Sequence, residues 1–311
     1  MQAEAMHASG IEAASRVLRS PWLHPLNDVD AIDDLLALVH PTWALGRIKA
    51  RVMAIRDEAP GVRSFLLRPN GRWPGFAAGQ HVVVSIEIRG VRHHRAFSLS
   101  SAPGDRFLRL TVKRNPAGRV STALHDQLAP GDVLALSPPA GDFVLPAPLP
   151  EKLLMLSAGS GITPLVSMLR DLRHRDPRHD VVFVHVCRTP ADALFAAELA
   201  ALAAAMPRLQ LVRHVTTAQG RLDADGIAAL VPDARERRTF LCGPPSFLAM
   251  VEARWAAEGC AHRLACERFG EPVGRAKAVG TPVQIRATRS GRSFPSTGER
   301  PLLVEAERAG L

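Results

Sequence analysis

The pattern of apolar and polar positions changes along the chain. Near the amino terminus, Val29–Val39 carries apolar residues at helical spacing and is followed by a His-Pro pair that should end a helix. From Arg47–Pro138, short alternating runs such as His81–Ile88 and Phe107–Lys113 are separated by Gly and Pro. This alternating pattern predicts a small antiparallel Greek-key β-barrel. One helix is expected to interrupt it at Ser121–Leu128, with Gly118 or Ser121 as its start signal.

The pattern of apolar and polar residues changes again after the proline-rich stretch Pro146–Pro150. Apolar strands now alternate strictly with helices, which predicts a doubly wound parallel sheet with helices on both faces. The expected strands are Leu153–Ser157, Val181–Val186, Leu209–Val215, Phe240–Cys242 and Leu264–Phe269, and the expected helices are Pro164–His174, Ala191–Ala205, Asp223–Leu230 and Pro245–Glu258.

The residue pattern in the last part of the chain predicts the beginning of a third domain. Val283–Thr288 reads as a strand, Gly291–Ser293 as a turn and Leu302–Ala309 as a helix. The expected fold is therefore β followed by α/β. Its five segments are an N-terminal helical extension (1–45), a β-barrel domain (46–148), an α/β domain (149–270), a linker (271–281) and an incomplete last fragment (282–311).

The amino-acid composition and the net charge limit the classes of protein to which this chain can belong. The 311 residues are 47% hydrophobic and 22% charged, as in folded soluble proteins, and no apolar run reaches bilayer length. The first ten residues do not resemble a secretory signal, so a cytoplasmic location is expected. The net charge of +9 rests almost entirely on scattered arginines and Tyr is absent, which favours a phosphate-bearing ligand over nucleic acid. The four cysteines form no CxxC pair, so no metal site is expected.

Two loops are candidates for phosphate binding. The first loop joins the first parallel strand to its helix and contains Gly159, Gly161, Thr163 and Pro164. Small residues in such a loop let a diphosphate approach the backbone amides at the start of the helix. A Gly-x-Gly alone also fits an ordinary tight turn, and Pro164 stands where the usual dinucleotide fingerprint has its third glycine. Gly118–Ser121 forms a second strand-to-helix junction, although a plain helix cap would give the same pattern.

A third candidate is the barrel strand Arg95-Ala96-Phe97-Ser98-Leu99-Ser100-Ser101. Alternation places Arg95, Phe97 and Leu99 on one face, which combines a cation, an aromatic ring and an apolar wall. The adjacent His93 and His94 should face opposite sides, which argues against a metal site there.

These motifs together resemble the ferredoxin–NADP reductase-like flavoproteins. Arg95–Ser101 resembles their flavin motif Arg-x-Tyr-Ser-x-x-Ser, Gly159–Pro164 resembles their pyridine-nucleotide loop Gly-x-Gly-x-x-Pro, and Cys242-Gly243-Pro244 resembles their nicotinamide-side motif. The resemblance covers Arg47–Gly270, most closely as in reductase components of oxygenase and desaturase systems. The tail from Val283 resembles the beginning of a plant-type [2Fe–2S] ferredoxin domain, without its cysteine ligands.

The resemblance implies a role for each matching residue. Arg95 would bind the flavin pyrophosphate, Phe97 would stack on the ring in place of the usual Tyr, and Ser98 would lie near flavin N5. Ser98, Cys242 and Glu267 are the implied catalytic residues. The implied cofactor-binding residues are Arg95, Ala96, Phe97, Ser98, Ser101, Val112, Lys113, Gly118, Val120, Ser121, Gly159, Gly161, Thr163, Pro164, Arg188, Cys242, Gly243, Pro244 and Phe269.

The implied activity is that of an NAD(P)H-dependent flavoprotein reductase. FAD is the expected flavin, with FMN as an alternative, and the choice between NADH and NADPH stays open although Arg188 lies where relatives distinguish a 2′-phosphate. The implied partner is an acidic electron acceptor, which would be a ferredoxin, an oxygenase or a desaturase, and any membrane contact would be through it. A monomer is expected. The alternative is a non-catalytic flavin- or nucleotide-binding sensor.

Overall fold

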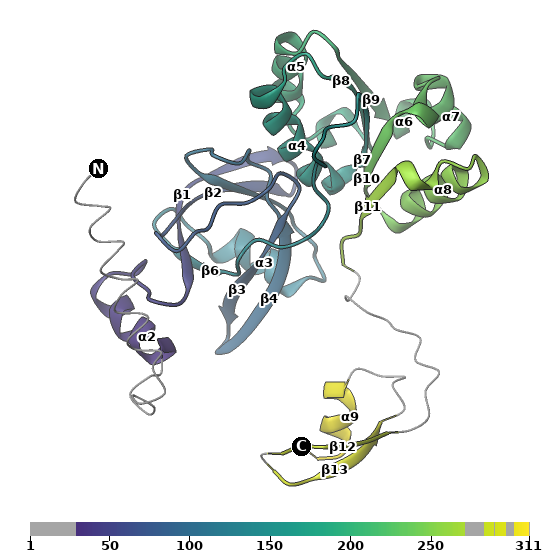
Figure 1. Cartoon of the computed structure of the whole chain (residues 1–311). Helices are drawn as coiled ribbons and strands as arrows, with labels where there is room; N and C mark the ends of the chain where they lie inside the picture. Colours follow the sequence, from purple (N-terminus) through teal and green to yellow (C-terminus); the bar gives the residue numbers. More distant parts are fainter. Residues whose placement is uncertain (1–28, 271–282, 289, 297–301, 311) are drawn as a thin grey trace. The chain divides into compact units, whose positions relative to one another are not determined.

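The computed structural model describes residues 29–270, 283–288, 290–296 and 302–310 (Figure 1). The chain divides into two units, residues 1–269 and residues 270–311. The interpretations of residues 1–28 as part of an extension and of 271–281 as a linker lie outside the described residues.

The first described element is the helix α2 (Val29–Val39), at the residues where the pattern predicts it. Its Asp33 is fully buried and accepts hydrogen bonds from the backbone amides of Leu45, Gly46 and Arg47, the last at 2.9 Å. Arg47 also pairs with the neighbouring carboxylate of Asp34 at 2.8 Å. These contacts fasten α2 to the segment that leads into the first strand.

Six antiparallel strands follow, ordered β4-β3-β6-β1-β2-β5. Their alternate residues form one apolar core. The two outermost strands of this order, β4 and β5, are not paired as a ladder: just after β4, Leu99 forms an isolated bridge with Leu110, and the amide of Ser100 donates to the carbonyl of Arg109 at 2.8 Å. The described strands therefore form no closed barrel, contrary to expectation. Leu99 is fully buried in the core and offers no apolar wall to a ligand. The strands are β1 (Ile48–Ala59), β2 (Val62–Pro69), β3 (His81–Ile88), β4 (Val91–Ser98), β5 (Leu108–Lys113) and β6 (Val133–Leu136).

The helix inserted among these strands is α3 (Arg119–Gln127), two residues earlier than predicted. Its N-cap is Gly118, and no side chain caps it. Of the two predicted start signals, Gly118 is therefore the one that the structure confirms, whereas Ser121 lies inside the helix and its Oγ accepts a hydrogen bond from the amide of Asn115 at 3.1 Å.

The second sheet is parallel, as predicted, with the order β11-β10-β7-β8-β9. Helices α4 and α5 cover one face and α7 and α8 the other, so the sheet is packed between two apolar cores. The elements are β7 (Lys152–Ala158), α4 (Ile162–Arg175), β8 (Asp180–Cys187), α5 (Ala196–Ala205), β9 (Leu209–Val215), α6 (Thr216–Gln219), α7 (Ala224–Leu230), β10 (Arg238–Cys242), α8 (Pro245–Ala257) and β11 (Leu264–Glu267).

The helix predicted from Ala191 begins later. A short 3₁₀ turn at Pro190–Asp192 comes first, and α5 starts at Ala196. The interruption is Phe195, whose φ of 56° lies in the left-handed region that residues with a side chain rarely adopt. Composition alone does not show this break, since the segment is rich in the helix former alanine.

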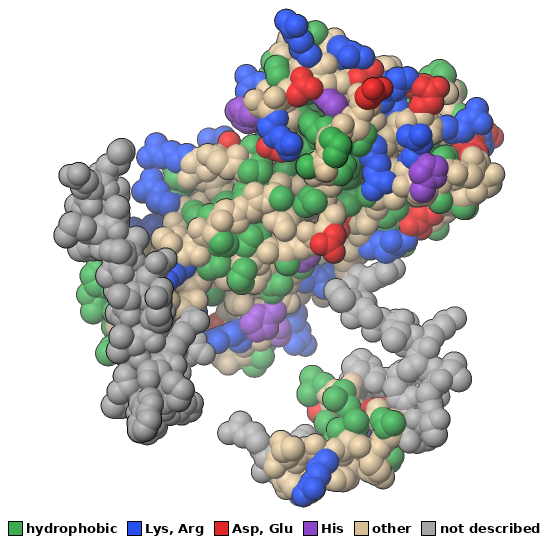
Figure 2. Space-filling view, in the orientation of Figure 1, with side chains coloured by type: hydrophobic (Ala, Val, Ile, Leu, Met, Phe, Trp, Pro, Cys, Tyr) green, Lys and Arg blue, Asp and Glu red, His purple; other side chains and the backbone are tan. Residues whose placement is uncertain are grey.

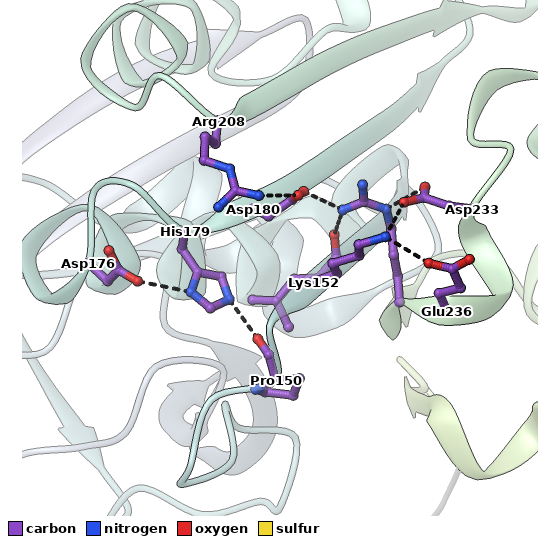
Figure 3. Close-up of polar contacts among 10 residues, drawn as sticks. Pro150, Lys152, Asp176, His179, Asp180, Arg208, Asp233 and Glu236 are labelled. Atoms are coloured by element: carbon purple, nitrogen blue, oxygen red, sulfur yellow. Dashed lines mark hydrogen bonds and ion pairs between the residues drawn. The ribbon is translucent and has the colours of Figure 1, made fainter.

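A charged network closes the amino-terminal edge of the parallel sheet (Figure 3). Arg237 donates to Asp180 at 2.6 Å and to Asp233 at 2.7 Å, and its side chain is only 8% exposed. Lys152, at the start of β7, pairs with Asp233 at 3.1 Å and Glu236 at 2.7 Å. This edge is therefore occupied by structural ion pairs, which leaves the opposite, carboxyl edge for a ligand.

The second unit is small. It holds the antiparallel hairpin of β12 (Val283–Arg286) and β13 (Ser293–Ser296), followed by α9 (Leu302–Arg308). The predicted first strand and helix are present, whereas β13 occupies part of the predicted turn. Phe294 is buried at 5% exposure.

Candidate active site

The strand order places the topological switch point of the parallel sheet at the carboxyl ends of β7 and β10. In a doubly wound sheet, ligands bind where the strand order reverses, and here the connections leave the neighbouring strands β7 and β10 in opposite directions. The two sequence motifs Gly159–Gly161 and Cys242-Gly243-Pro244 follow directly after these two strands. The fold therefore brings together two motifs that lie about eighty residues apart in the sequence.

The glycines are required by this geometry. Gly159 has a φ of 54°, and the space around it is open. A Cβ on Gly161 would lie 2.3 Å from the backbone oxygen of Cys242, so any side chain there would separate the two strand ends. Beyond Gly161, α4 begins at Ile162, and Thr163 Oγ1 donates to the carbonyl of Ser160 at 3.1 Å. Pro164 is buried in the first turn of this helix.

The flavin-motif residues lie at the end of β4. Arg95 and Ala96 are exposed and Phe97 is half-buried. Ser98 is 5% exposed, and its Oγ has no hydrogen-bond partner among the residues that the structure describes. A buried hydroxyl without a partner is costly, so this atom fits a bound group that hydrogen-bonds to it. Ser101 is buried as well, and its Oγ accepts from the Arg109 amide at 3.2 Å.

The residues expected to bind a second phosphate are only partly available. Lys113 is exposed at the end of β5. The side chain of Val112 lies in the core, and its carbonyl accepts a hydrogen bond from His125 Nε2 at 2.9 Å. Val120 and Ser121 are buried in the first turn of α3, which follows the N-cap Gly118.

Cys242 and Glu267 are directly paired across β10 and β11. Cys242 is fully buried, and burial, followed by the nearby carboxylate of Glu267, raises the pKa of its thiol well above the ordinary value. Burial also raises the pKa of Glu267. Phe269, two residues on, is 40% exposed. The thiol is therefore neutral at physiological pH and not suited to nucleophilic attack.

His81 joins the two halves of the site and is absent from the sequence predictions. Its Nδ1 lies 4.0 Å from Glu267 Oε1, and burial lowers its pKa. Within the antiparallel sheet, His81 of β3 pairs with Ser98 of β4. The series Ser98, His81, Glu267 and Cys242 thus links the flavin motif to the nicotinamide motif. No sequence signal indicates His81, because its position depends on pairing across two sheets.

Arg188 lies just after β8 and is exposed. The nearby Asp192 accepts hydrogen bonds from the amide and hydroxyl of Thr189 at 3.1 and 2.7 Å. The hydrogen bond from Thr189 lowers the pKa of Asp192, and the charges of Arg188 and Lys113 lower it further. Cations from both sheets therefore lie close to this turn, which suits an anionic ligand.

The remaining candidates do not form sites. His94 Nδ1 lies 2.7 Å from Ser85 Oγ, and the described residues contain no cluster of three His, Cys, Asp or Glu suited to a metal ion. All four cysteines are free thiols.

No described helix is both long and apolar enough to cross a bilayer. Lys and Arg are spread over the visible face, with Asp and Glu among them (Figure 2).

Comparison with known proteins agrees with this geometry. Residues 51–145 match the oxidoreductase FAD-binding domain and residues 155–253 the oxidoreductase NAD-binding domain. The NADPH oxidoreductase of Mycobacterium tuberculosis is 37% identical over 305 residues, which cover 94% of this chain and 80% of that protein. This chain is a ferredoxin reductase-like flavoprotein.

Two further proteins are similar to this chain. The glycine betaine monooxygenase reductase subunit of Chromohalobacter salexigens is 31% identical to this flavoprotein, with 87% of this chain and 82% of that protein covered. The FAD/NAD-binding domain of nitric oxide dioxygenase from Vibrio cholerae is 27% identical with a TM-score of 0.65, and the match covers 72% of this chain and 99% of that domain.

The flavoprotein is an NAD(P)H-dependent reductase with FAD and NAD(P)H as its cofactors. FAD, when bound, supplies the capacity to take up a hydride and release electrons one at a time. The structure fits both groups, since among the described residues Ser98 Oγ is buried without a partner at one side of the site, and the space at Gly159, just before the start of α4, is open at the other.

Proposed function

We propose that this flavoprotein passes electrons from NAD(P)H through FAD to an iron–sulfur protein or domain that serves an oxygenase or desaturase. The observation that carries the proposal is the link between the two halves of the site. Glu267, the strand partner of Cys242, lies 4.0 Å from His81, the strand partner of Ser98. A nicotinamide held at Cys242 would therefore face a flavin held at Ser98.

Each set of residues has a role in this proposal. Arg95 binds the flavin pyrophosphate, Phe97 packs on the flavin ring and Ser98 hydrogen-bonds to it. The amides at the start of α4 bind the nucleotide diphosphate. Cys242 positions the nicotinamide. Lys113 and Arg188 attract the remaining phosphate groups.

The acceptor follows from charge and from the relatives. A net charge of +9 favours an acidic protein partner. The relative from Chromohalobacter salexigens is named as the reductase subunit of a monooxygenase. The second unit holds a hairpin followed by a helix. The resemblance of this segment in sequence to the opening of a ferredoxin domain further supports an iron–sulfur acceptor.

The test is flavin retention in Arg95→Ala. A guanidinium grips a pyrophosphate with two parallel hydrogen bonds, so its removal should yield a largely colourless protein. Arg92→Ala is the matched control, because Arg92 is exposed on the opposite face of β4. Full flavin content with unchanged affinity in Arg95→Ala would show that the flavin site is misassigned.

A spectrum before and after NAD(P)H separates the reductase from the sensor alternative. Loss of the flavin absorbance under anaerobic conditions, followed by its return when an iron–sulfur acceptor is added, is the expected result. Stable flavin absorbance in the presence of NAD(P)H would favour a non-catalytic binding protein.

A further inference from the structure

The two sheets of the first unit are connected by a partly buried ion cluster that no cofactor assignment uses. Arg109 on β5 donates to Glu58 on β1 and, at 3.0 Å, to Ser64 Oγ on β2. Its Nη1 also donates to Glu198 Oε2 on α5 at 3.0 Å. Arg170 on α4 donates to the other oxygen, Glu198 Oε1, at 2.5 Å. Glu198 therefore bridges the antiparallel sheet and the helices of the parallel sheet.

The charges of this cluster are balanced and poorly hydrated. The side chains of Arg109 and Arg170 are 12% and 9% exposed, and that of Glu58 is 11% exposed. Burial alone would raise the pKa of Glu198, but the two guanidiniums outweigh it and hold that pKa below its ordinary value. Glu198, whose side chain is 36% exposed, is thus ionised at neutral pH. Removal of Arg109 leaves the carboxylate of Glu58, which is only 11% exposed, without this partner.

Phe195 completes the cluster. Its ring lies 4.7 Å from the guanidinium carbon of Arg109 and 5.5 Å from that of Arg170. The residue is buried and keeps the left-handed φ of 56° described above. Such a conformation persists only where the surroundings determine it. The backbone turn before α5 is therefore fitted to this contact.

The cluster is mechanically connected to the active site through α4. Ser167 Oγ on this helix donates to the carbonyl of Ser101 at 2.6 Å, and both residues are buried. Ser101 ends the flavin motif, and the amino terminus of the same helix follows Gly161. One helix thus contacts the flavin side, the nucleotide loop and, through Arg170, the cluster.

Apolar packing holds the sheets together but leaves room at this point. Val62 and Phe143 from the antiparallel half share a core with Leu165 and Met168 of α4. Next to the cluster, however, lies an open pocket of about 330 Å³, lined by Asp105 and by residues of α4 and α5 that include Arg170 and Glu198. Since apolar side chains do not fill this region, the polar contacts of Glu198 fix the local geometry.

We propose that Arg109 is a positioning residue, which with Glu198 sets the alignment of the nicotinamide-side strand end at Cys242 relative to the flavin-side strand end at Ser98. The inference rests on the cofactor placement proposed above. Removal of the bridge lets α4 and α5 shift while the apolar core keeps the sheets associated. A displacement of about 1 Å at reacting groups is enough to slow a reaction about a hundredfold.

The experiment is a double-mutant cycle on the full chain with Arg109→Met, Glu198→Gln and the double variant. We expect flavin reduction by NAD(P)H, followed by stopped-flow absorbance, to slow about 10- to 100-fold in each single variant. The double variant should be no slower than the slower single variant, because both lose the same bridge. Flavin content and flavin reduction by dithionite should stay unchanged.

A second measurement reports the structural change directly. Amide hydrogen exchange at residues 193–199 should become faster in the two single variants, with or without bound flavin. Arg237→Met is the matched control, because Arg237 is also a buried guanidinium with two carboxylate partners, all within the parallel-sheet part. It should lose stability without slowing flavin reduction in the folded protein.

The outcomes separate this inference from the proposed function. Wild-type rates and unchanged exchange in Arg109→Met would overturn the inference while leaving the proposed function intact. Slower reduction that Arg237→Met reproduces to the same extent would also overturn it, as a general stability effect. Absence of flavin reduction in the wild-type chain would instead count against the proposed function.

Discussion

The buried histidine of β8 makes the stability of this flavoprotein depend on pH. His185 is 2% exposed, and its Nδ1 lies 2.8 Å from Ser157 Oγ. Burial, with the positive charge of Arg213 as a second cause, lowers its pKa from 6.5 to about 4. The folded protein therefore keeps the ring neutral at pH values where the unfolded chain protonates it.

This depressed pKa stabilises the fold above pH 6.5, and the stabilisation is lost as the pH falls towards about 4. The full difference corresponds to about 3 kcal/mol. Between pH 7.5 and pH 4.5, His185→Gln should therefore lose about 2 to 3 kcal/mol less unfolding free energy than the wild type, measured by urea titration. His262→Gln, at an exposed position, should behave as the wild type. Equal losses in all three proteins would contradict the assignment.

Cys242 supports a second prediction. Because its raised pKa keeps the thiol neutral, Cys242→Ala removes packing volume beside the proposed nicotinamide position without removing a charge. Flavin reduction by NAD(P)H should slow about tenfold, with unchanged flavin content and no new pH dependence between pH 6 and 9. Stopped-flow absorbance measures this rate.

Cys266→Ala is the control for Cys242→Ala. Cys266 is the strand partner of Leu241, so its side chain lies on the other face of the sheet and packs towards α8. It should leave the reduction rate unchanged. Equal rates in Cys242→Ala and the wild type would leave Cys242 as a structural thiol only.

At the scale of elements, α2 depends on one carboxylate. Asp33 is fully buried and accepts three backbone hydrogen bonds, so Asp33→Ala leaves those amides without their acceptor, at a cost of about 2 to 3 kcal/mol. We expect α2 to detach and to be cleaved first in limited proteolysis, with flavin content preserved.

Asp34→Ala provides the comparison for this helix. Its side chain is 68% exposed, and its pairing with Arg47 contributes little stability in solvent. Proteolysis of Asp34→Ala should therefore match that of the wild type. Cleavage of α2 at wild-type rates in Asp33→Ala would mean that the buried carboxylate does not hold the helix.

Elements with strong local signals are predictable from the sequence. The ends of the five parallel strands lie within two residues of their predicted positions, because buried strands are continuous apolar runs between polar loops. The start of α5 is not, since Phe195 adopts its left-handed conformation in contact with Arg109 and Arg170, which come from other elements. The open edge between β4 and β5 also depends on tertiary contacts, which a sequence pattern does not contain.

The same distinction holds for the site. The glycine loop and the Cys242 motif lie where a parallel sheet must bring them together, so their proximity follows from topology. His81, Arg109 and Glu198 carry no local motif. Their positions are set by the contact between the two sheets, which is visible only in the structure.

At the scale of the whole molecule, the first unit has two distinct ends. Ion pairs around Arg237 close the amino-terminal edge of the parallel sheet, whereas its carboxyl edge faces the end of β4. The Arg109 cluster lies between the antiparallel sheet and the helices α4 and α5. Binding and structural charges are thus separated, so the structural pairs can be altered without removing a ligand contact.

The cysteine positions support the last prediction, which concerns where electrons leave this chain. A [2Fe–2S] centre takes four protein ligands, usually thiolates at close spacing, yet Cys187, Cys242, Cys260 and Cys266 all precede the second unit, and no Cys follows residue 266. The purified 311-residue chain should therefore contain flavin without iron or sulfide, as metal analysis can measure. With NAD(P)H it should reduce ferricyanide directly, since a small oxidant needs only access to the flavin, but it should support an oxygenase or desaturase only after a separate ferredoxin is added. Stoichiometric iron with sulfide in the purified chain, or turnover of the terminal enzyme with no added carrier, would contradict this account of the electron path.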